Sequence, residues 1–203
     1  MKKWFIPLAV IAVLLFAVYS WAKGFNNKAV VLQEDAKTTW SNVESAYQRR
    51  NDLIGNLVKT VQGAADFEKS TLTEVINARA KATSTSINFG DLSAANMANF
   101  QQAQAGLSGA LSKLLVSVER YPDLKSNANF LELQSQLEGT ENRINVARDR
   151  FNEGVNNYNK HIKIFPNSVL AGMFNFEEMD RYKANPGSEN APDINFDFNK
   201  KAA

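Results

Sequence analysis

The most apolar part of the chain is a run close to its N-terminal end. Residues 4–22 are 19 positions without a charge, rich in Leu, Val, Ile, Phe and Ala, and lysines flank the run on both sides. A helix needs about 20 mainly apolar residues to cross a bilayer. Trp4 and Trp21 stand at the two ends of the run, where amphipathic rings suit the headgroup level. The pattern therefore predicts that residues 1–24 form a single transmembrane anchor.

A cleaved secretory signal is the alternative interpretation of this run. Ser20 and Ala22 resemble the small-residue cleavage site of such signals, but the run is longer than their usual apolar region. We therefore favour a retained anchor. Lys2 and Lys3 favour a cytoplasmic N-terminus and a soluble domain on the extracytoplasmic side, although Lys23 and further lysines beyond the run compete with them.

After the run, the hydrophobic pattern becomes that of amphipathic helices. Apolar side chains recur at alternating spacings of three and four in four segments, as along the seam of a left-handed helix bundle. The chain is therefore predicted to be all-α, with Arg50 interrupting the first seam. The seam positions are Trp40, Val43, Tyr47, Arg50, Ile54, Leu57, Val61 and Ala64, then Leu72, Val75, Ile76 and Arg79, then Phe100, Ala103, Leu107, Leu111, Leu114, Val118 and Tyr121, and finally Phe130, Leu133, Leu137, Ile144, Phe151, Val155, Tyr158, Ile162 and Phe165.

Capping residues and prolines predict the helix boundaries. Asp91 and Ser126 are expected N-caps, Pro122 is expected to end the third helix, and Phe165-Pro166 the fourth. Gly63 leaves open whether the first two segments are separate helices or one bent helix, because a single glycine costs a helix only about 1 kcal/mol.

The lengths of the segments predict an elongated body. Helices near residues 27–62 and 126–164 would each exceed roughly 50 Å at the usual rise per residue. We therefore expect the body, residues 25–184, to be a rod that continues the anchor.

The C-terminal tail, residues 185–203, lacks the helical pattern. Proline, glycine and asparagine replace it, which predicts an extended or disordered segment. Ile194, Phe196 and Phe198 alternate with polar residues within this tail. They are typical of a docking motif for a partner or of a short strand, and packing of the aromatic rings on the body is the plain alternative.

Composition argues against several classes of function. The chain has no cysteine, which excludes disulfides, cysteine metal sites and thiol catalysis. Beyond Lys2 and Lys3, 21 basic residues balance 21 acidic ones, so the body lacks the positive field of a nucleic-acid-binding domain. The motifs of P-loops, zinc proteases and serine hydrolases are absent from the sequence. We therefore expect no enzyme activity, no cofactor and no nucleic-acid partner.

Single titratable residues add little to this picture. His161 is the only histidine, and no carboxylate lies one helical turn away from it, so a structural role is favoured over a catalytic one. Glu141, Asp149 and Glu153 lack the Glu-x-x-His pairing of di-metal helix bundles, and no metal site is expected.

Small residues mark one stretch of the third segment, at Gly106 and Gly109. Such residues permit close packing of another helix. Tight packing inside the bundle is the simpler interpretation, and a contact between two copies of the chain is the alternative, so an oligomer is possible.

Two long stretches of the chain resemble the LemA family. The first runs from Trp40 to Thr83 and reads WSNVESAYQRRNDLIGNLVKTVQGAADFEKSTLTEVINARAKAT. The second runs from Glu141 to Phe176 and reads ENRINVARDRFNEGVNNYNKHIKIFPNSVLAGMFNF. The resemblance, which leaves out the tail, implies an elongated antiparallel four-helix bundle of the up-and-down type, preceded by one transmembrane helix. The family also includes magnetosome membrane proteins, and the resemblance implies no catalytic residues.

Polar residues gather in these two stretches, on or beside the seams. A charged or amide side chain near a bundle core must be paired. We therefore expect the two stretches to face each other through interhelical hydrogen bonds or ion pairs, with a face for a partner as the alternative. The residues are Arg50, Asn51, Asn56 and Arg79 in the first stretch and Glu141, Asn142, Asn145 and Arg148 in the second.

The anchor and the missing chemistry together predict a non-enzymatic, membrane-anchored interaction or scaffold protein of the bacterial cell envelope. Its expected contacts are the membrane, through a single span, and a protein partner in the envelope. The alternative is an accessory subunit, or an enzyme with an unrecognised site acting in the envelope. That alternative requires a cleft with a carboxylate or amide cluster.

Overall fold

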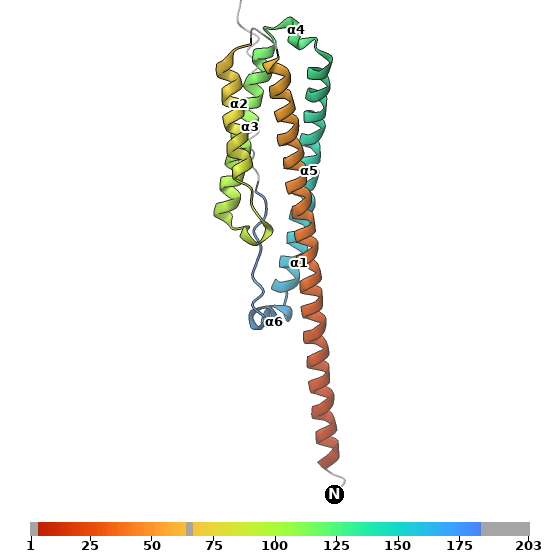
Figure 1. Ribbon diagram of the computed structural model, residues 1–203. Helices are drawn as coiled ribbons and strands as arrows, with labels where there is room; N and C mark the ends of the chain where they lie inside the picture. The colour runs from red at the N-terminus through yellow and green to blue at the C-terminus, as the bar shows by residue number, and fades with distance from the viewer. Residues whose placement is uncertain (1–3, 64–66, 184–203) are drawn as a thin grey trace, which may run out of the picture.

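The computed structural model describes residues 4–63 and 67–183, and over these residues the chain is helical without strands (Figure 1). The predicted all-α class and the long apolar N-terminal helix are therefore confirmed. The elements, in order, are α1 (Phe5–Gln62), α2 (Lys69–Ser84), the 3-10 helix η2 (Phe89–Asp91), α3 (Ala94–Val118), α4 (Pro122–Lys125), α5 (Ala128–Lys163) and α6 (Asn167–Met173).

Helix α1 joins the apolar run and the first segment of the body in one uninterrupted helix of 58 residues. At 1.5 Å per residue it is about 87 Å long. Gly24 lies where the two parts meet and does not break the helix. Side chains from Trp4 to Tyr19 are exposed, whereas from Phe25 onward one side of the helix is buried. Among the described residues, α1 is the one helix long and apolar enough to cross a membrane.

The long helices lie side by side in two pairs. Helix α1 packs along α5, and α2 packs along α3, with α2 also contacting α1 (Figure 1). Ile54, Val75 and Leu114 meet Leu137 in a core to which α1, α2, α3 and α5 all contribute. The two pairs differ in length: α2 and α3 flank only the upper part of α1 and α5 in the view of Figure 1.

Two further core clusters follow along α1 toward the apolar run. In the middle one, the Trp40 ring lies 5.0 Å from Phe151 on α5 and 6.1 Å from Phe100 on α3, measured between centroids. The Trp40 indole nitrogen donates to the carbonyl of Ile87 at 3.1 Å, which ties the connection between α2 and α3 to α1. The lowest cluster joins Phe25 of α1 to α5 and α6.

Helices α1 and α5 approach closely at Gly154. A Cβ atom placed on Gly154 would lie 3.2 Å from the Thr39 hydroxyl oxygen and 3.4 Å from the Cα of Ala36. The absence of a side chain at this position therefore sets the spacing of the pair. Gly106 and Gly109 on α3 behave differently, because a Cβ atom there would meet nothing within 4 Å. The interpretation of these two glycines as tight packing inside the bundle was wrong.

Several predicted boundaries shift by a few residues. Ser93, not Asp91, caps α3, with its hydroxyl accepting from the amide of Asn96. Asn127, not Ser126, caps α5. In both places a second capping side chain stands within two residues of the expected one, so sequence alone did not choose between them.

The remaining boundaries concern prolines and Gly63. Helix α3 ends at Val118, and Pro122 begins the short helix α4 instead of ending α3. This agrees with the preference of proline for the first turn of a helix. Helix α5 ends at Lys163, shortly before Pro166, as expected. Helix α1 ends at Gln62 and α2 begins at Lys69, so the first two segments are separate helices.

Residues 177–183 form an extended segment, here called the strap, that passes between the two helix pairs (Figure 1). Asn159 of α5 accepts from the amide of Met179 and donates to its carbonyl, both at 2.9 Å. Asn152, two turns earlier, holds the amide and carbonyl of Tyr182 in the same way, at 2.8 and 2.9 Å. Two asparagines on one helix face thus satisfy the backbone of an extended chain that has no strand beside it.

Asn152→Ala should loosen the strap without unfolding the helices. It removes two hydrogen bonds to Tyr182, each worth about 0.5–1.5 kcal/mol, so hydrogen exchange of the Tyr182 amide should become roughly tenfold faster or more. Asn156→Ala is the matched control, because Asn156 lies one turn away on α5 and accepts only from the exposed Arg181 side chain at 2.8 Å. Hydrogen exchange would be measured by mass spectrometry or NMR, and equal exchange of the Tyr182 amide in the two variants would contradict the role of Asn152 in holding the strap.

Candidate functional site

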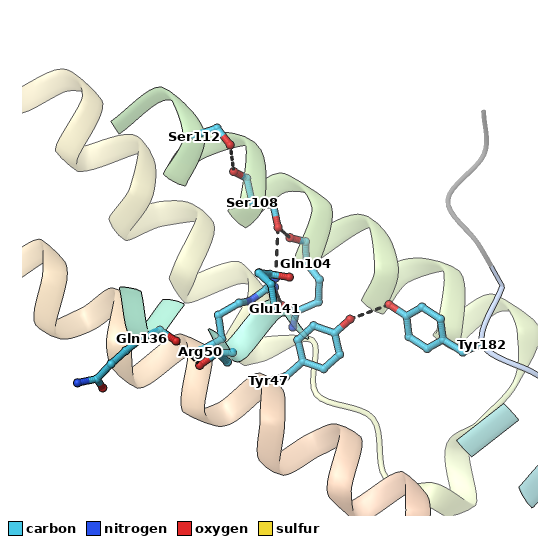
Figure 2. A network of polar contacts seen from close by, with 9 residues as sticks. Tyr47, Arg50, Gln104, Ser108, Ser112, Gln136, Glu141 and Tyr182 are labelled. Atoms are coloured by element: carbon cyan, nitrogen blue, oxygen red, sulfur yellow. Dashed lines mark hydrogen bonds and ion pairs between the residues drawn. The ribbon is translucent and has the colours of Figure 1, made fainter. Parts of the chain in front are cut away.

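A buried polar site lies in the bundle, and the guanidinium of Arg50 is at its centre. Arg50 as a whole is only 3% exposed. Figure 2 shows it between α1, α3 and α5. Nη1 donates to Glu141 Oε1 of α5 at 2.8 Å and to Ser108 Oγ of α3 at 3.2 Å. Nη2 donates to Gln104 Oε1 of α3. One charged side chain therefore connects three helices.

The partners of Arg50 explain how a charge can be buried in this core. An unpaired buried guanidinium would be strongly unfavourable, and an anion with further acceptors offsets that cost. The carboxylate of Glu141 supplies the charge and remains 48% exposed, so it keeps part of its hydration. The Tyr47 ring lies 5.0 Å from the Arg50 Cζ and adds a cation–π contact. The Nε atom of Arg50 has no partner among the described residues.

The strap reaches this site through a pair of tyrosines. The hydroxyls of Tyr47 and Tyr182 are 2.8 Å apart (Figure 2). Burial, with the neighbouring Tyr182, raises the pKa of Tyr47 well above its ordinary value, so its phenol stays neutral. The guanidinium of Arg148 covers the other ring, with its Cζ 4.0 Å from the centroid of Tyr182. The last described residues of the chain are thus joined to the centre of the rod.

A groove of about 570 Å³ opens beside this network, between α1 and α2. It shares Tyr47 and Gln104 with the polar site, and its lining mixes acids, a base, hydroxyls and apolar groups. Burial raises the pKa of Glu44 above its ordinary value. The lining residues are Ser41, Glu44, Ser45, Tyr47, Gln48, Asn51, Asp52, Arg79, Ala82, Thr83, Ser86, Ile87, Phe100 and Gln104.

Asn51 and Arg79 meet at the floor of the groove. The Arg79 Nε donates to the backbone carbonyl of Asn51 at 2.8 Å, which ties α2 to α1. The side-chain oxygen of Asn51 is buried and accepts no hydrogen bond from the described residues. Such an acceptor is costly to leave unpaired.

The structure places the predicted polar residues in several different environments. Arg50 and Glu141 form the buried ion pair, Asn51 and Arg79 meet in the groove, and Arg148 stacks on the strap. Asn56 is exposed and lines a second hollow of about 460 Å³ together with Asp52 and Arg79. Asn142 and Asn145 are exposed on α5, away from the seam. Ile194, Phe196 and Phe198 lie outside the described residues.

Sequence reasoning missed the partners that come from α3 and from the strap. Gln104 and Ser108 lie on the third segment, where the sequence pattern indicated only an apolar seam and two glycines. Tyr182 lies just before the tail and carries no helical periodicity. The spacing of seven between Asn152 and Asn159 was a usable signal, since it places both amides on one face of α5.

His161 has a structural environment. Its ring stacks on Phe25 with centroids 5.1 Å apart, and Nε2 lies 3.2 Å from the carbonyl oxygen of Phe25. Within residues 4–63 and 67–183, no group of three or more His, Cys, Asp or Glu side chains comes close enough together to hold a metal ion.

Comparison with known proteins gives a consistent set of relatives. The sequence model described as LemA family matches residues 39–196, which extends into the tail. Magnetosome protein MamQ of Magnetospirillum gryphiswaldense is 27% identical over 181 residues, covering 80% of this chain and 66% of that protein. Magnetosome protein MamQ 2 of Paramagnetospirillum magneticum is 26% identical with the same coverage. Protein LemA of Metamycoplasma hominis is 22% identical over 148 residues, covering 73% of this chain and 64% of that protein. The chain thus aligns with slightly less than two thirds of the length of these relatives.

Glu141→Gln should destabilise the body by about 1–2 kcal/mol, because it leaves the buried guanidinium of Arg50 without an anion. The destabilisation is measured as the difference in the free energy of unfolding between the variant and the unaltered protein, from urea titrations in the same detergent. Glu74→Gln is the matched control, since Glu74 pairs with Lys113 at the surface, where such pairs contribute about 0–1 kcal/mol.

A double-mutant cycle tests whether the two residues are coupled. The pair Arg50→Met and Glu141→Gln should cost less together than the sum of the single changes, because Met leaves no buried charge to satisfy. Strict additivity would show that the ion pair is not energetically coupled.

Proposed function

The chain belongs to the LemA family, and we propose that it is a non-enzymatic, membrane-anchored interaction or scaffold protein of the bacterial cell envelope. The observation that carries the proposal is α1. This single helix contains both the candidate membrane span and one wall of the polar groove. A rigid connection of this kind suits a protein that holds a partner at a fixed height above a membrane.

The proposed anchor follows from the exposure of the apolar run. None of the window that gives α1 its membrane-spanning character is buried inside the protein. Large apolar surface exposed in this way requires another apolar environment, and a bilayer supplies it. By the distribution of lysines around the run, the proposed body lies on the extracytoplasmic side.

The proposed partner site is the groove between α1 and α2. It offers an exposed acid at Asp52 and the donors of Arg79, next to the apolar side chains of Ile87 and Phe100. Alternating polar and apolar features suit a segment of a protein chain, whose amides donate and whose side chains alternate in polarity.

The relatives support the family without supplying a partner for the proposal. Two of them are named magnetosome proteins. Because the aligned part covers 66% of their length, we propose no partner of theirs for this chain.

A photo-reactive amino acid at Gln48, on the exposed rim of the groove, should capture a specific envelope protein in intact cells. The same amino acid at Gln102 is the matched control, because Gln102 is exposed on α3 and does not line the groove. Asp52→Asn should reduce the crosslink at Gln48 several-fold, since it removes a charged acceptor from the rim. Equal capture at both positions, unaffected by Asp52→Asn, would refute the groove as the partner site.

Two deletions separate the other parts of the proposal. Removal of the anchor, residues 1–24, should abolish the crosslink although the helical content of the body persists. Truncation after Pro186 should weaken the crosslink if the tail motif at Ile194, Phe196 and Phe198 also docks, and leave it unchanged if the groove alone binds.

The alternative of an unrecognised site would be favoured by a different result. In that case none of these experiments would capture a partner, and small molecules added to the body would shift its melting temperature.

A further inference from the structure

A second apolar surface surrounds α6, at the end of the body next to the apolar part of α1. Helix α6 packs on the rod through Leu170 and Ala171, in the same core cluster as Phe25 and Ala29 of α1. In Figure 1 it forms the lower end of the helical body, and below it α1 continues alone among the described residues. It therefore lies beside α1 where the candidate span ends.

Side chains at and around α6 that lie outside this core are large, apolar and exposed. Val169 and Met173 are 53% and 72% exposed, and their spacing of four places them on one face of α6. Ile164, Phe165 and Phe174, on either side of α6, are 50%, 79% and 45% exposed. We call these five residues the foot. Large exposed apolar side chains gathered at one end of a body in this way are typical of an interaction surface.

The level of the foot along α1 indicates what covers it. Phe174 stacks on Phe25, with ring centroids 6.3 Å apart. Phe25 lies three residues beyond Ala22, where the uncharged run ends, which is about 4.5 Å along the helix axis. The headgroup region adds roughly 5–8 Å on each side of the hydrocarbon core, so a foot at this level reaches headgroups if α1 spans the bilayer.

The charges near the foot suit a lipid surface. Lys23, Lys28 and Lys160 are exposed on the parts of α1 and α5 that adjoin it. Two acids lie a few residues after α6: Glu178 is paired with Lys163 at 2.9 Å, and Glu177 is exposed, so the basic residues outnumber the acids at this end only slightly. Interfacial segments combine exposed apolar side chains with basic residues in this way, and the basic residues contact anionic headgroups.

We propose that the foot inserts into the lipid headgroup region as a second membrane contact beside the span. The proposal rests on the proposed anchoring by α1, and the occupant of the foot is lipid. Two membrane contacts on one rod fix its tilt and its rotation about its own long axis, which a lone span leaves much less constrained.

Spin labels on single cysteines in the full-length chain test this, because the sequence has no native cysteine. Val13, Val116 and Val169 make a matched set: all three are helical valines, with exposures of 67%, 72% and 53%. Val13 lies in the apolar run, and Val116 lies near the far end of α3. In nanodiscs of phosphatidylethanolamine and phosphatidylglycerol, collision rates with oxygen and with a water-soluble nickel chelate report the surroundings of each label.

The oxygen-to-nickel collision ratio at V169C should be several-fold higher than at V116C and lower than at V13C. A ratio at V169C equal to that at V116C, with V13C high, would overturn the foot and leave the anchor standing. Low collision rates with both reagents at V169C would show a protein contact and also overturn it. A water-like ratio at V13C would refute the anchor itself. M173C repeats the measurement on the same face of α6, and circular dichroism checks that each variant keeps its helices.

Discussion

Burial of the Arg50 charge constrains the position of every long helix that surrounds it. The guanidinium sits in the seam of α1, where an apolar side chain would otherwise pack, and it is tolerated because Glu141 and Gln104 reach it from α5 and α3. A shift of one helix by a turn would remove an acceptor and leave the charge unpaired. Purely apolar seams tolerate such shifts far better, so we propose that this network, and not the hydrophobic clusters alone, fixes the register of the rod.

Sequence alone predicted the parts of the fold that have a periodic hydrophobic pattern. The spacing of apolar residues gave the four long segments, and the charge within the first seam pointed to a paired Arg50. The positions of α6 and of the strap could not be obtained in this way, because they depend on contacts between residues far apart in the chain, such as Tyr47 with Tyr182. The partners from α3 were missed for a related reason: Gln104 and Ser108 carry no charge, and neutral side chains on a helix have many equivalent roles.

The strap links the middle and the lowest core clusters of the rod. Met179 adjoins both the middle and the lowest core clusters, and Tyr182 ends beside the polar site. Gln101 of α3 donates to the carbonyl of Lys183 at 3.2 Å, so the strap touches both helix pairs. The two asparagines of α5 hold the backbone of the strap, and the side chain of Tyr182 adds the contacts to Tyr47 and Arg148. The strap therefore supplies cohesion between α5 and the α2–α3 pair, whose direct contact is small.

Because α1 is one unbroken helix, a change in the inclination of its apolar part moves the groove sideways. Gln48, at the rim of the groove, lies about 40 Å along the axis from Ala22, so a change of roughly 10° in the inclination of α1 would displace the groove by about 7 Å. Inclination of a single span depends on how its apolar length matches the thickness of the bilayer. If α1 spans the bilayer as proposed and the foot does not hold its tilt, local membrane thickness would set the lateral position of the groove. A partner fixed elsewhere in the envelope would then meet the groove at a different distance when the membrane thickens or thins.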